Sequence, residues 1–387
     1  MPPSRSRANA CNFIRSFPGE TFLSVVFCLF IQREQGSEGP CSLPKLAFAS
    51  NRKPNWHTGN EDAYALSGAV CRTPCTQPGY TEFLSLPMRK RIEFWLVAAV
   101  AHALGWMPRG LARLLAGVLV GGVYPLLLRL RRVGLRNLEL AYPQLSMAER
   151  ERILRGVFRH LGWQLVEFCR MRRYTPENTR NWIGVEGMEH YLAARARGKG
   201  VLIVTGHLGA WELSSFYHSL MGYPMGMVIR RLDNRMLDEF VNDIRCLHGN
   251  RVLHKDDFAR GLLTAMRAGD TVGILMDTNM TPPQGEFVEF FGRPACTASG
   301  LARVALKTGA AVLPGFMLWE KAERRYMLHF GEELQFTRGG DAQADVLAAT
   351  QLCTSAIESW IRRYPDQWLW IHRRWKTRPT GEAGLYT

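Results

Sequence analysis

A histidine and a glutamate five residues apart, His207 and Glu212, are the side chains of this sequence best suited to acid–base chemistry. An imidazole can remove a proton from a hydroxyl when a carboxylate holds its other ring nitrogen, because the carboxylate fixes the tautomer and raises the basicity of the free nitrogen. Two residues five apart on one α-helix point about 140° away from each other. The two side chains therefore converge only if His207 lies on a turn and Glu212 in the first turn of a helix.

The spacing alone is a weak signal, and the context of His207 strengthens it. With 10 histidines and 34 acidic residues, a chance match is expected, and His57 with Asp62 is one. His207 follows an apolar run, 201–205, has glycines on both sides and precedes an amphipathic stretch, whereas His57 lies in an irregular region. The plain alternative is an early glutamate that complements the helix macrodipole beside an incidental histidine.

The elements that must position this pair alternate between two periodicities. Short apolar runs predict strands, and amphipathic stretches between them predict helices. The predicted strands are 201–205, 225–229, 271–276 and 311–316. The predicted helices are 147–172, 211–220, 237–247, 258–268, 299–307 and 346–363. Such alternation favours an α/β fold with a mainly parallel sheet flanked by helices.

Two apolar segments near the start of this body indicate a membrane-anchoring helical segment. Residues 92–107 are apolar apart from Glu93 and His102, and 114–128 carry no charge. Fifteen residues rising about 1.5 Å each fall short of a hydrocarbon core of roughly 30 Å, so a tilted or re-entrant anchor is expected. Arginines before and after the segments favour the cytoplasmic side and anionic headgroups. The alternative is a buried hairpin of core helices.

The chain is expected to have three parts. Residues 1–87 lack helical or strand periodicity and are rich in Pro, Gly, Ser and Cys, which predicts a disordered extension or sequence upstream of the true start at Met88. Residues 88–136 form the membrane-associated segment, and 137–380 form the remaining domain. The later cysteines, Cys169, Cys246, Cys296 and Cys353, are expected to be free thiols, mostly in the core.

Composition bounds the functions. The 387 residues include 49 basic and 34 acidic ones, a net charge of +15, with 47% hydrophobic residues. These values exclude wholesale disorder and a polytopic membrane protein. The positive charge fits nucleic acid, an anionic membrane or phosphorylated substrates. Nucleic acid is the least favoured, because the basic clusters flank apolar segments and no RNA- or DNA-binding module pattern occurs.

Several ordered blocks together resemble the bacterial lipid A biosynthesis acyltransferases, the lauroyl/myristoyl type of the lysophospholipid acyltransferase superfamily. The resemblance runs from about Met88 to Pro379. The family's His-x4-Asp/Glu element matches His207 and Glu212. The other matching blocks are 137–143, Arg230 with Asp233 and Asn234, Asp277 at the end of a strand, 290–297, and 364–379.

The resemblance implies a mechanism and roles for these residues. Family members transfer a fatty acyl chain from acyl carrier protein to a hydroxyl of a phosphorylated glucosamine lipid at the inner membrane. Carried over, His207 is the general base, Glu212 orients it, and Arg230 and Asn234 lie in the substrate-binding block. Asp277 is expected to position Arg230 or the acceptor. Direct transfer without an acyl-enzyme is expected, with no cofactor and no metal.

The basic tail after the last predicted helix carries two further candidates, Arg373 and Arg374. They are expected to meet lipid phosphates or the acidic carrier protein, and the alternative is a solvated surface strand. The expected partners are therefore acyl carrier protein, a phosphorylated glycolipid acceptor and an anionic membrane. Two other functions stay open at this point: acylation of another phosphoglycolipid, of the phosphatidylinositol mannoside type, and non-enzymatic lipid binding.

Overall fold

The computed structural model of the chain describes residues 87–254 and 258–386. The extension predicted over 1–87 lies outside the described residues, apart from Pro87. The first described helix, α3, begins at Met88.

The described strands form a seven-stranded sheet, in the order β1-β9-β8-β2-β5-β3-β4, and a separate hairpin of β6 and β7. The five strands from β8 to β4 are parallel to one another, whereas β9 is antiparallel to β8 and β1 is parallel to β9. The strands are β1 Ile183–Glu186, β2 Val201–Thr205, β3 Met225–Ile229, β4 Arg251–His254, β5 Thr271–Leu275, β6 Gly285–Phe290, β7 Arg293–Ala298, β8 Ala311–Glu320 and β9 Arg325–Phe330. The predicted α/β fold with a mainly parallel sheet is confirmed.

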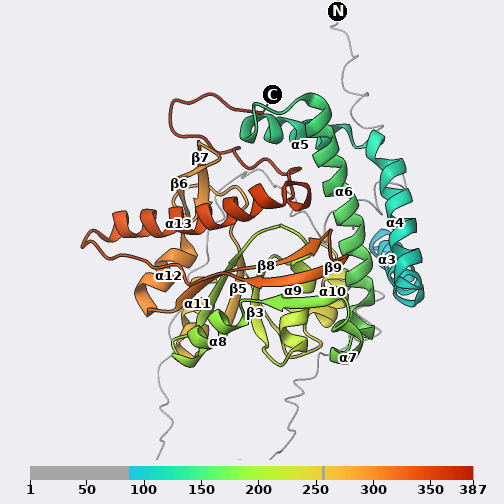
Figure 1. The fold of residues 1–387 in the computed structure, drawn as a ribbon, viewed down its shortest axis with the longest axis horizontal. Coiled ribbons are helices and arrows are strands. Elements are labelled where there is room, and N and C mark those ends of the chain that lie inside the picture. Colours follow the sequence, from blue (N-terminus) through green and yellow to red (C-terminus); the bar gives the residue numbers. More distant parts are fainter. Residues whose placement is uncertain (1–86, 255–257, 387) are drawn as a thin grey trace, which may run out of the picture.

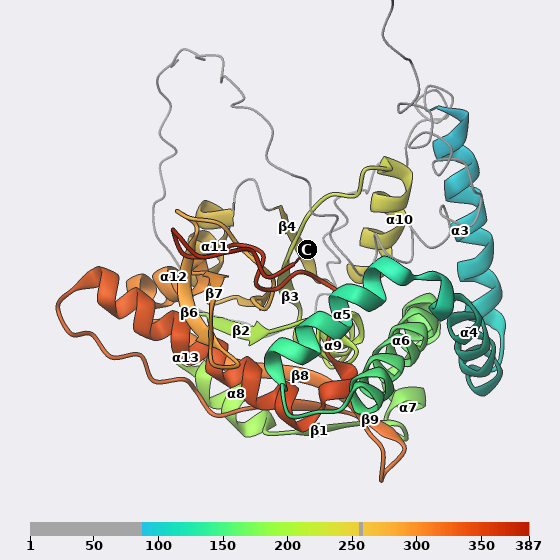
Figure 2. The same ribbon diagram turned by 90° about the horizontal axis from the view of Figure 1, so that it is seen from above.

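Helices cover both faces of the sheet and extend beyond one edge (Figure 1). The helices are α3 Met88–Trp106, α4 Arg109–Val123, η2 Tyr124–Leu126, α5 Leu128–Ala141, α6 Met147–Arg170, η3 Met171–Arg173, α7 Pro176–Thr179, α8 Met188–Ala196, α9 Trp211–Leu220, α10 Arg235–Arg245, α11 Phe258–Arg267, α12 Gly300–Thr308, α13 Ala342–Arg363 and η5 Pro365–Gln367. Figure 2 shows α3 and α4 at the periphery, with α6 between them and the sheet.

The central strand β2 shows why a parallel sheet forms here. Its first four side chains, from Val201 to Val204, are all buried, because helices cover both faces of the sheet. An uninterrupted apolar run therefore replaces the alternating pattern of a half-exposed strand. The four strands predicted from such runs are β2, β3, β5 and β8, and β8 continues four residues further than predicted.

Helix α6 begins where its sequence predicts. The Ser146 side chain accepts a hydrogen bond from the backbone of Glu149, whose carboxylate accepts one from the Ser146 backbone. This capping box satisfies donors that the first turn leaves open. The helix is 24 residues long, and its buried face carries Glu167, which anchors α4 through two arginines.

Helix α4 lies along α6 and exposes its other face. Ala112 and Ala116 are buried against Val166 of α6. Arg109 and Arg113 of α4 both pair with the buried carboxylate of Glu167, at 3.0 and 2.6 Å. The exposed face carries large apolar side chains: Leu111, Leu114, Leu115, Val118 and Leu119. By length and composition, the stretch Arg109–Leu126 is the one candidate membrane span among the described residues.

The four later cysteines are free thiols, as predicted. Cys296 and Cys353 are buried, whereas Cys169 and Cys246 are partly buried. Burial raises the pKa of Cys353 to about 12, so this thiol is a packing group.

Candidate active site

Three predicted residues follow three neighbouring parallel strands. His207 comes two residues after β2, Asp277 two residues after β5, and Arg230 directly after β3. Because β2, β5 and β3 are adjacent and parallel, their carboxyl ends share one edge of the sheet. Ligand sites of open α/β sheets lie at this edge.

The imidazole of His207 is held by the carboxylate of Asp277. His207 Nδ1 lies 2.9 Å from Asp277 Oδ1, and the His207 backbone N–H donates to Asp277 Oδ2 at 2.7 Å. Both residues are buried, with His207 6% and Asp277 1% exposed. The two contacts fix the imidazole both at its ring and at its backbone.

Asp277 stays ionised, and this decides the tautomer of His207. Burial by itself would raise the pKa of this carboxyl. The charge of His207 and its hydrogen bond to Asp277 lower that pKa, as do the charge of His372 and the hydrogen bond from Trp368, and the result lies well below the usual value. An ionised carboxylate only accepts hydrogen bonds, so Nδ1 of His207 carries the proton. Nε2, which makes no hydrogen bond to any described residue, then has the free lone pair that a general base needs.

A tryptophan of the C-terminal segment completes the support of Asp277. Trp368 Nε1 donates to Asp277 Oδ2 at 2.7 Å, and its side chain is fully buried. The same segment is tied to the histidine turn by backbone bonds, from Leu369 N to His207 O and from Gly209 N to Gln367 O, both at 3.0 Å. The segment 367–369 therefore fixes the turn as well as the carboxylate.

Two glycines allow the histidine turn to pack this closely. A Cβ at Gly206 would stand 3.0 Å from the Asp277 carboxylate. Gly209 has a φ of +65°, and a Cβ there would collide with the carbonyl oxygen of Met317. Glycine tolerates both the positive φ and the close approach.

Glu212 is placed differently from the sequence prediction. It lies in the first turn of α9, as expected, but its carboxylate pairs with the Arg245 guanidinium of α10, which donates through Nε at 2.9 Å and through a second nitrogen. Both side chains are nearly buried, at 8% and 10% exposed. The carboxylate that orients His207 is thus that of Asp277, which lies 70 residues further along the chain.

The residues of the Arg230 block divide between surface and scaffold. Arg230 is about one third exposed and lies 3.4 Å from Asp233. Asn234 is buried, caps α10 through Met236 N, and donates to the carbonyl of Lys90 at the start of α3. Arg230 therefore lies at the surface, whereas Asn234 joins α10 to α3.

The two arginines of the basic tail also differ in their exposure to solvent. Arg373 is partly exposed beside the Tyr386 ring. Arg374 is fully buried and donates to the carbonyl of Cys296 at 2.9 Å and to the Thr297 hydroxyl. Burial lowers the pKa of Arg374 to about 10, which leaves it charged at neutral pH. The prediction that Arg374 meets a phosphate does not fit this burial, because its donors are turned to protein oxygens.

Three contributors to this site were not singled out from the sequence. They are Trp368, which donates to Asp277, Arg245, which pairs with Glu212, and His372, which lies close to Asp277. Burial lowers the pKa of His372, whose imidazole also interacts with Asp277. Trp368 and His372 lie within the closing block 364–379, whereas no motif marks Arg245. In the described part of the chain, no group of three or more His, Cys, Asp or Glu side chains is arranged to hold a metal.

Comparison with known proteins identifies the family. The sequence model of the bacterial lipid A biosynthesis acyltransferases matches residues 82–377. The lipid A biosynthesis palmitoleoyltransferase of Escherichia coli K12 is 32% identical over 263 residues, which cover 68% of this chain and 84% of that enzyme. The lauroyltransferase of the same organism is 27% identical over 65% of this chain and 80% of its own length. A Haemophilus influenzae lipid A biosynthesis acyltransferase is 28% identical over 74% and 86%. The chain belongs to the bacterial lipid A biosynthesis acyltransferase family and is an enzyme.

Proposed function

We propose that this enzyme moves a fatty acyl chain from acyl carrier protein to a hydroxyl of a lipid A precursor, directly and without a covalent enzyme intermediate. The names of its relatives, which include palmitoleoyl- and lauroyltransferases of lipid A biosynthesis, support the acceptor class. The observation that carries the chemistry is the buried His207–Asp277 pair at the carboxyl edge of the sheet.

In the proposed reaction, His207 Nε2 removes the proton from the acceptor hydroxyl as its oxygen attacks the thioester carbonyl. The C–S bond then breaks, and the imidazolium returns its proton to the leaving thiolate. The Asp277 carboxylate, 2.9 Å from Nδ1, stabilises the transient imidazolium and prevents the ring from rotating. Arg230 supplies the charge that binds an acceptor phosphate or the developing oxyanion, since its guanidinium fork suits oxyanions.

Glu212 acts through Arg245 in this proposal. The ion pair ties the first turn of α9 to α10, and α9 begins four residues after His207. The pair therefore positions the turn that carries the base. Asn234, at the other end of α10, and partly exposed Arg373 are proposed to complete the substrate-binding side, the first through the scaffold and the second by contact with phosphate.

The enzyme is proposed to lie on the cytoplasmic face of the inner membrane. The apolar face of α4 points away from the body, while Arg109 and Arg113 tie the opposite face to Glu167. A helix held along its length in this way favours an in-plane position, with its exposed leucines among the acyl chains. The arginines of α5 supply charge for anionic headgroups.

Purified enzyme given a matrix of donors and acceptors tests this function. The donors are acyl carrier proteins with different chains and the matching acyl-coenzyme A, and the acceptors are phosphorylated and dephosphorylated glucosamine lipids and a phosphatidylinositol mannoside. We expect mass spectrometry to show one added acyl ester on the phosphorylated glucosamine lipid with carrier-protein donors. Preferred acylation of the mannoside, or the absence of any transfer, would refute the proposal.

A further inference from the structure

Two hollows on the surface of the described residues meet at helix α6. One, with a volume of about 550 Å³, lies between α4 and α6, and the other, of about 1080 Å³, lies between α6 and the segment from Arg363 to Gln367. Arg155 and Arg159 line both hollows. Neither hollow contains His207, Asp277 or Arg230, so they are separate from the reacting groups.

The first hollow, the α4–α6 groove, is lined mainly by apolar residues, and glycines of α4 leave it open. Gly110, Gly117 and Gly121 line it, and a Cβ on any of them would meet nothing within 4 Å. Leu114 and Val118 border the same groove and are 63% and 66% exposed. The groove therefore opens on the apolar face of α4, which we place in the membrane.

The second hollow, the basic pocket, has an excess of positive charge. Its cationic residues are Arg152, Arg155, Arg159, Lys321 and Arg363, and its carboxylates are Glu151, Glu320 and Asp366. Lys321 Nζ forms an ion pair with Asp366 Oδ2 at 2.8 Å, and the Tyr364 hydroxyl donates to Glu320 at 2.7 Å. The carboxylates are thus partly satisfied without the arginines of α6.

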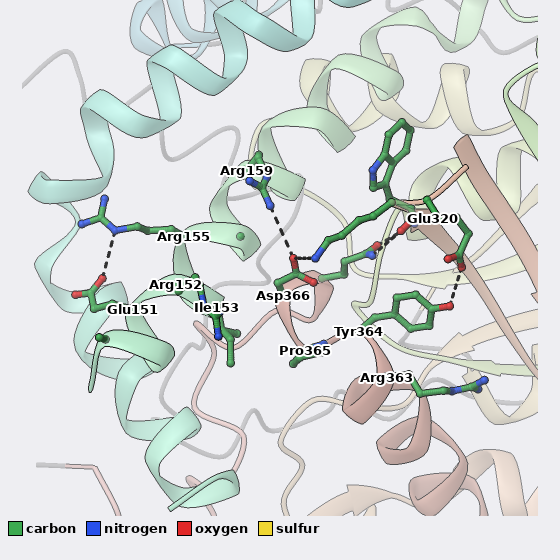
Figure 3. Close-up of a pocket in the computed structure, with 16 residues that line it drawn as sticks. Glu151, Arg152, Ile153, Arg155, Arg159, Glu320, Arg363, Tyr364, Pro365 and Asp366 are labelled. Carbon is green, nitrogen blue, oxygen red and sulfur yellow. Dashed lines mark hydrogen bonds and ion pairs between the residues drawn. The ribbon is translucent and has the colours of Figure 1, made fainter. Parts of the chain in front are cut away.

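The two shared arginines keep their donors for a ligand. Arg155 lies 3.8 Å from Glu151 and Arg159 lies 3.8 Å from Asp366, which are ion-pair distances beyond hydrogen-bond length. Figure 3 shows the two guanidinium groups pointing in different directions, that of Arg155 to Glu151 and that of Arg159 to Asp366 on the side of the basic pocket. Neither makes a hydrogen bond to another described residue. A phosphate at Arg159 could accept the paired N–H bonds for which guanidinium is suited.

We propose that the groove and the pocket together bind one anionic phospholipid of the membrane, with an alkyl chain in the α4–α6 groove and the phosphate at Arg159, which lines both hollows. The groove volume lies within the range of about 300–1,000 Å³ that is typical of small-molecule sites. The proposal rests on the membrane position of α4 and not on the acyl transfer, because His207, Asp277 and Arg230 do not line either hollow. The lipid fixes the enzyme on anionic membrane.

Binding of a soluble single-chain probe tests the site. Decyl phosphate below its micelle concentration is titrated into the full-length enzyme by calorimetry, with decanol and inorganic phosphate as separate arms. We expect saturable binding of decyl phosphate that weakens at least tenfold in Gly117→Leu, which fills the groove, and in Arg159→Gln. The matched controls are Gly122→Leu, on the same helix with an equally open Cβ position, and Arg267→Gln, an exposed arginine of α11 outside both hollows; both should bind as the wild type does.

Several results would overturn the proposal. Equal binding of inorganic phosphate would show a simple anion site, and equal binding of decanol would show an apolar site without headgroup recognition. Equal weakening by the controls, or no saturable binding, would remove the site altogether. Displacement of decyl phosphate by a phosphorylated glucosamine lipid but not by dihexanoyl phosphatidylglycerol would assign the site to the acceptor instead. Acyl transfer measured on the same samples separates these results from a failure of the proposed function.

Discussion

The His207 imidazole and the Asp277 carboxylate lie 2.9 Å apart, although 70 residues separate them in the chain. They meet because each follows one of two adjacent parallel strands, β2 and β5, at the same edge of the sheet. The same carboxylate also accepts hydrogen bonds from the His207 backbone and from Trp368. The orientation of the His207 imidazole is therefore a property of the sheet topology and of the C-terminal segment.

Asp277→Asn should lower the rate of acyl transfer by about 10²- to 10⁴-fold, the usual contribution of acid–base catalysis. An amide cannot balance an imidazolium, and it no longer enforces the tautomer with the proton on Nδ1. Single-turnover rates with a fixed donor and acceptor measure the effect. Asp243→Asn, at an exposed carboxylate of α10, is the control and should keep normal turnover. Equal rates for the Asp277 and Asp243 variants would be incompatible with the assigned role.

Glu212→Gln should act on stability first. Removing one partner of a buried ion pair costs roughly 3–5 kcal/mol, because the remaining charge is left uncompensated. We expect a reduced free energy of unfolding in urea for both Glu212→Gln and Arg245→Gln, with a smaller loss of turnover than in Asp277→Asn. If Glu212→Gln abolished turnover while its stability stayed normal, Glu212 would take part in the chemistry directly, as the family motif implies.

His218 should make the enzyme less stable in mild acid. Burial among Tyr191, Tyr223 and Phe330 lowers the pKa of His218 from 6.5 to about 4, an effect that Arg195 reinforces. Between these two pH values the unfolded chain binds a proton that the folded chain does not, so stability falls as the pH decreases from 6.5 to 4.

The loss from this one group amounts to about 3 kcal/mol at most, at about 1.4 kcal/mol per pH unit. The free energy of unfolding of His218→Phe, measured in urea at several pH values, should decline less steeply over this range than that of the wild type. Parallel declines would show that His218 does not contribute.

Replacing Leu115 and Leu119 together by serine should weaken binding to anionic vesicles. Both side chains are exposed on α4, at 44% and 49%, and each buried leucine contributes up to about 1.5–3 kcal/mol. Sedimentation with phosphatidylglycerol vesicles measures the change. The control pair is Leu192→Ser with Leu347→Ser, two similarly exposed leucines on α8 and α13. Equal vesicle binding by both double variants would contradict the membrane position of α4.

The sequence predicts the elements that carry long apolar runs or strong amphipathic patterns. Strands β2 and β3 and helix α9 have the predicted bounds, because a buried parallel strand needs an uninterrupted apolar run. Strand β9 was missed. It follows a tight turn after β8, and its apolar residues mix with Arg325 and His329, so no run marks it. The hairpin of β6 and β7 was treated only as a family block for the same reason.

The candidate site was only partly predictable. The turn at His207 is evident from its local context, whereas Asp277 was singled out only by the family resemblance. The resemblance also made Glu212 the expected partner of His207, whereas the pairing with Asp277 depends on which strands are neighbours. The burial of Arg374 depends on the packing of β7 against the C-terminal segment. Contacts of this kind join residues far apart in the chain, and a single sequence does not encode them as a spacing.

The most direct test of the account compares wild-type enzyme with His207→Ala, using an acyl carrier protein donor and a phosphorylated glucosamine lipid acceptor. Mass spectrometry follows the acyl ester product, while urea unfolding and vesicle sedimentation verify that folding and membrane binding are intact. The account predicts that the product disappears in His207→Ala, whereas the variant still unfolds cooperatively in urea, at a lower free energy because Asp277 loses a partner, and still sediments with vesicles. Product formation at the wild-type rate by the folded, membrane-bound variant would contradict it.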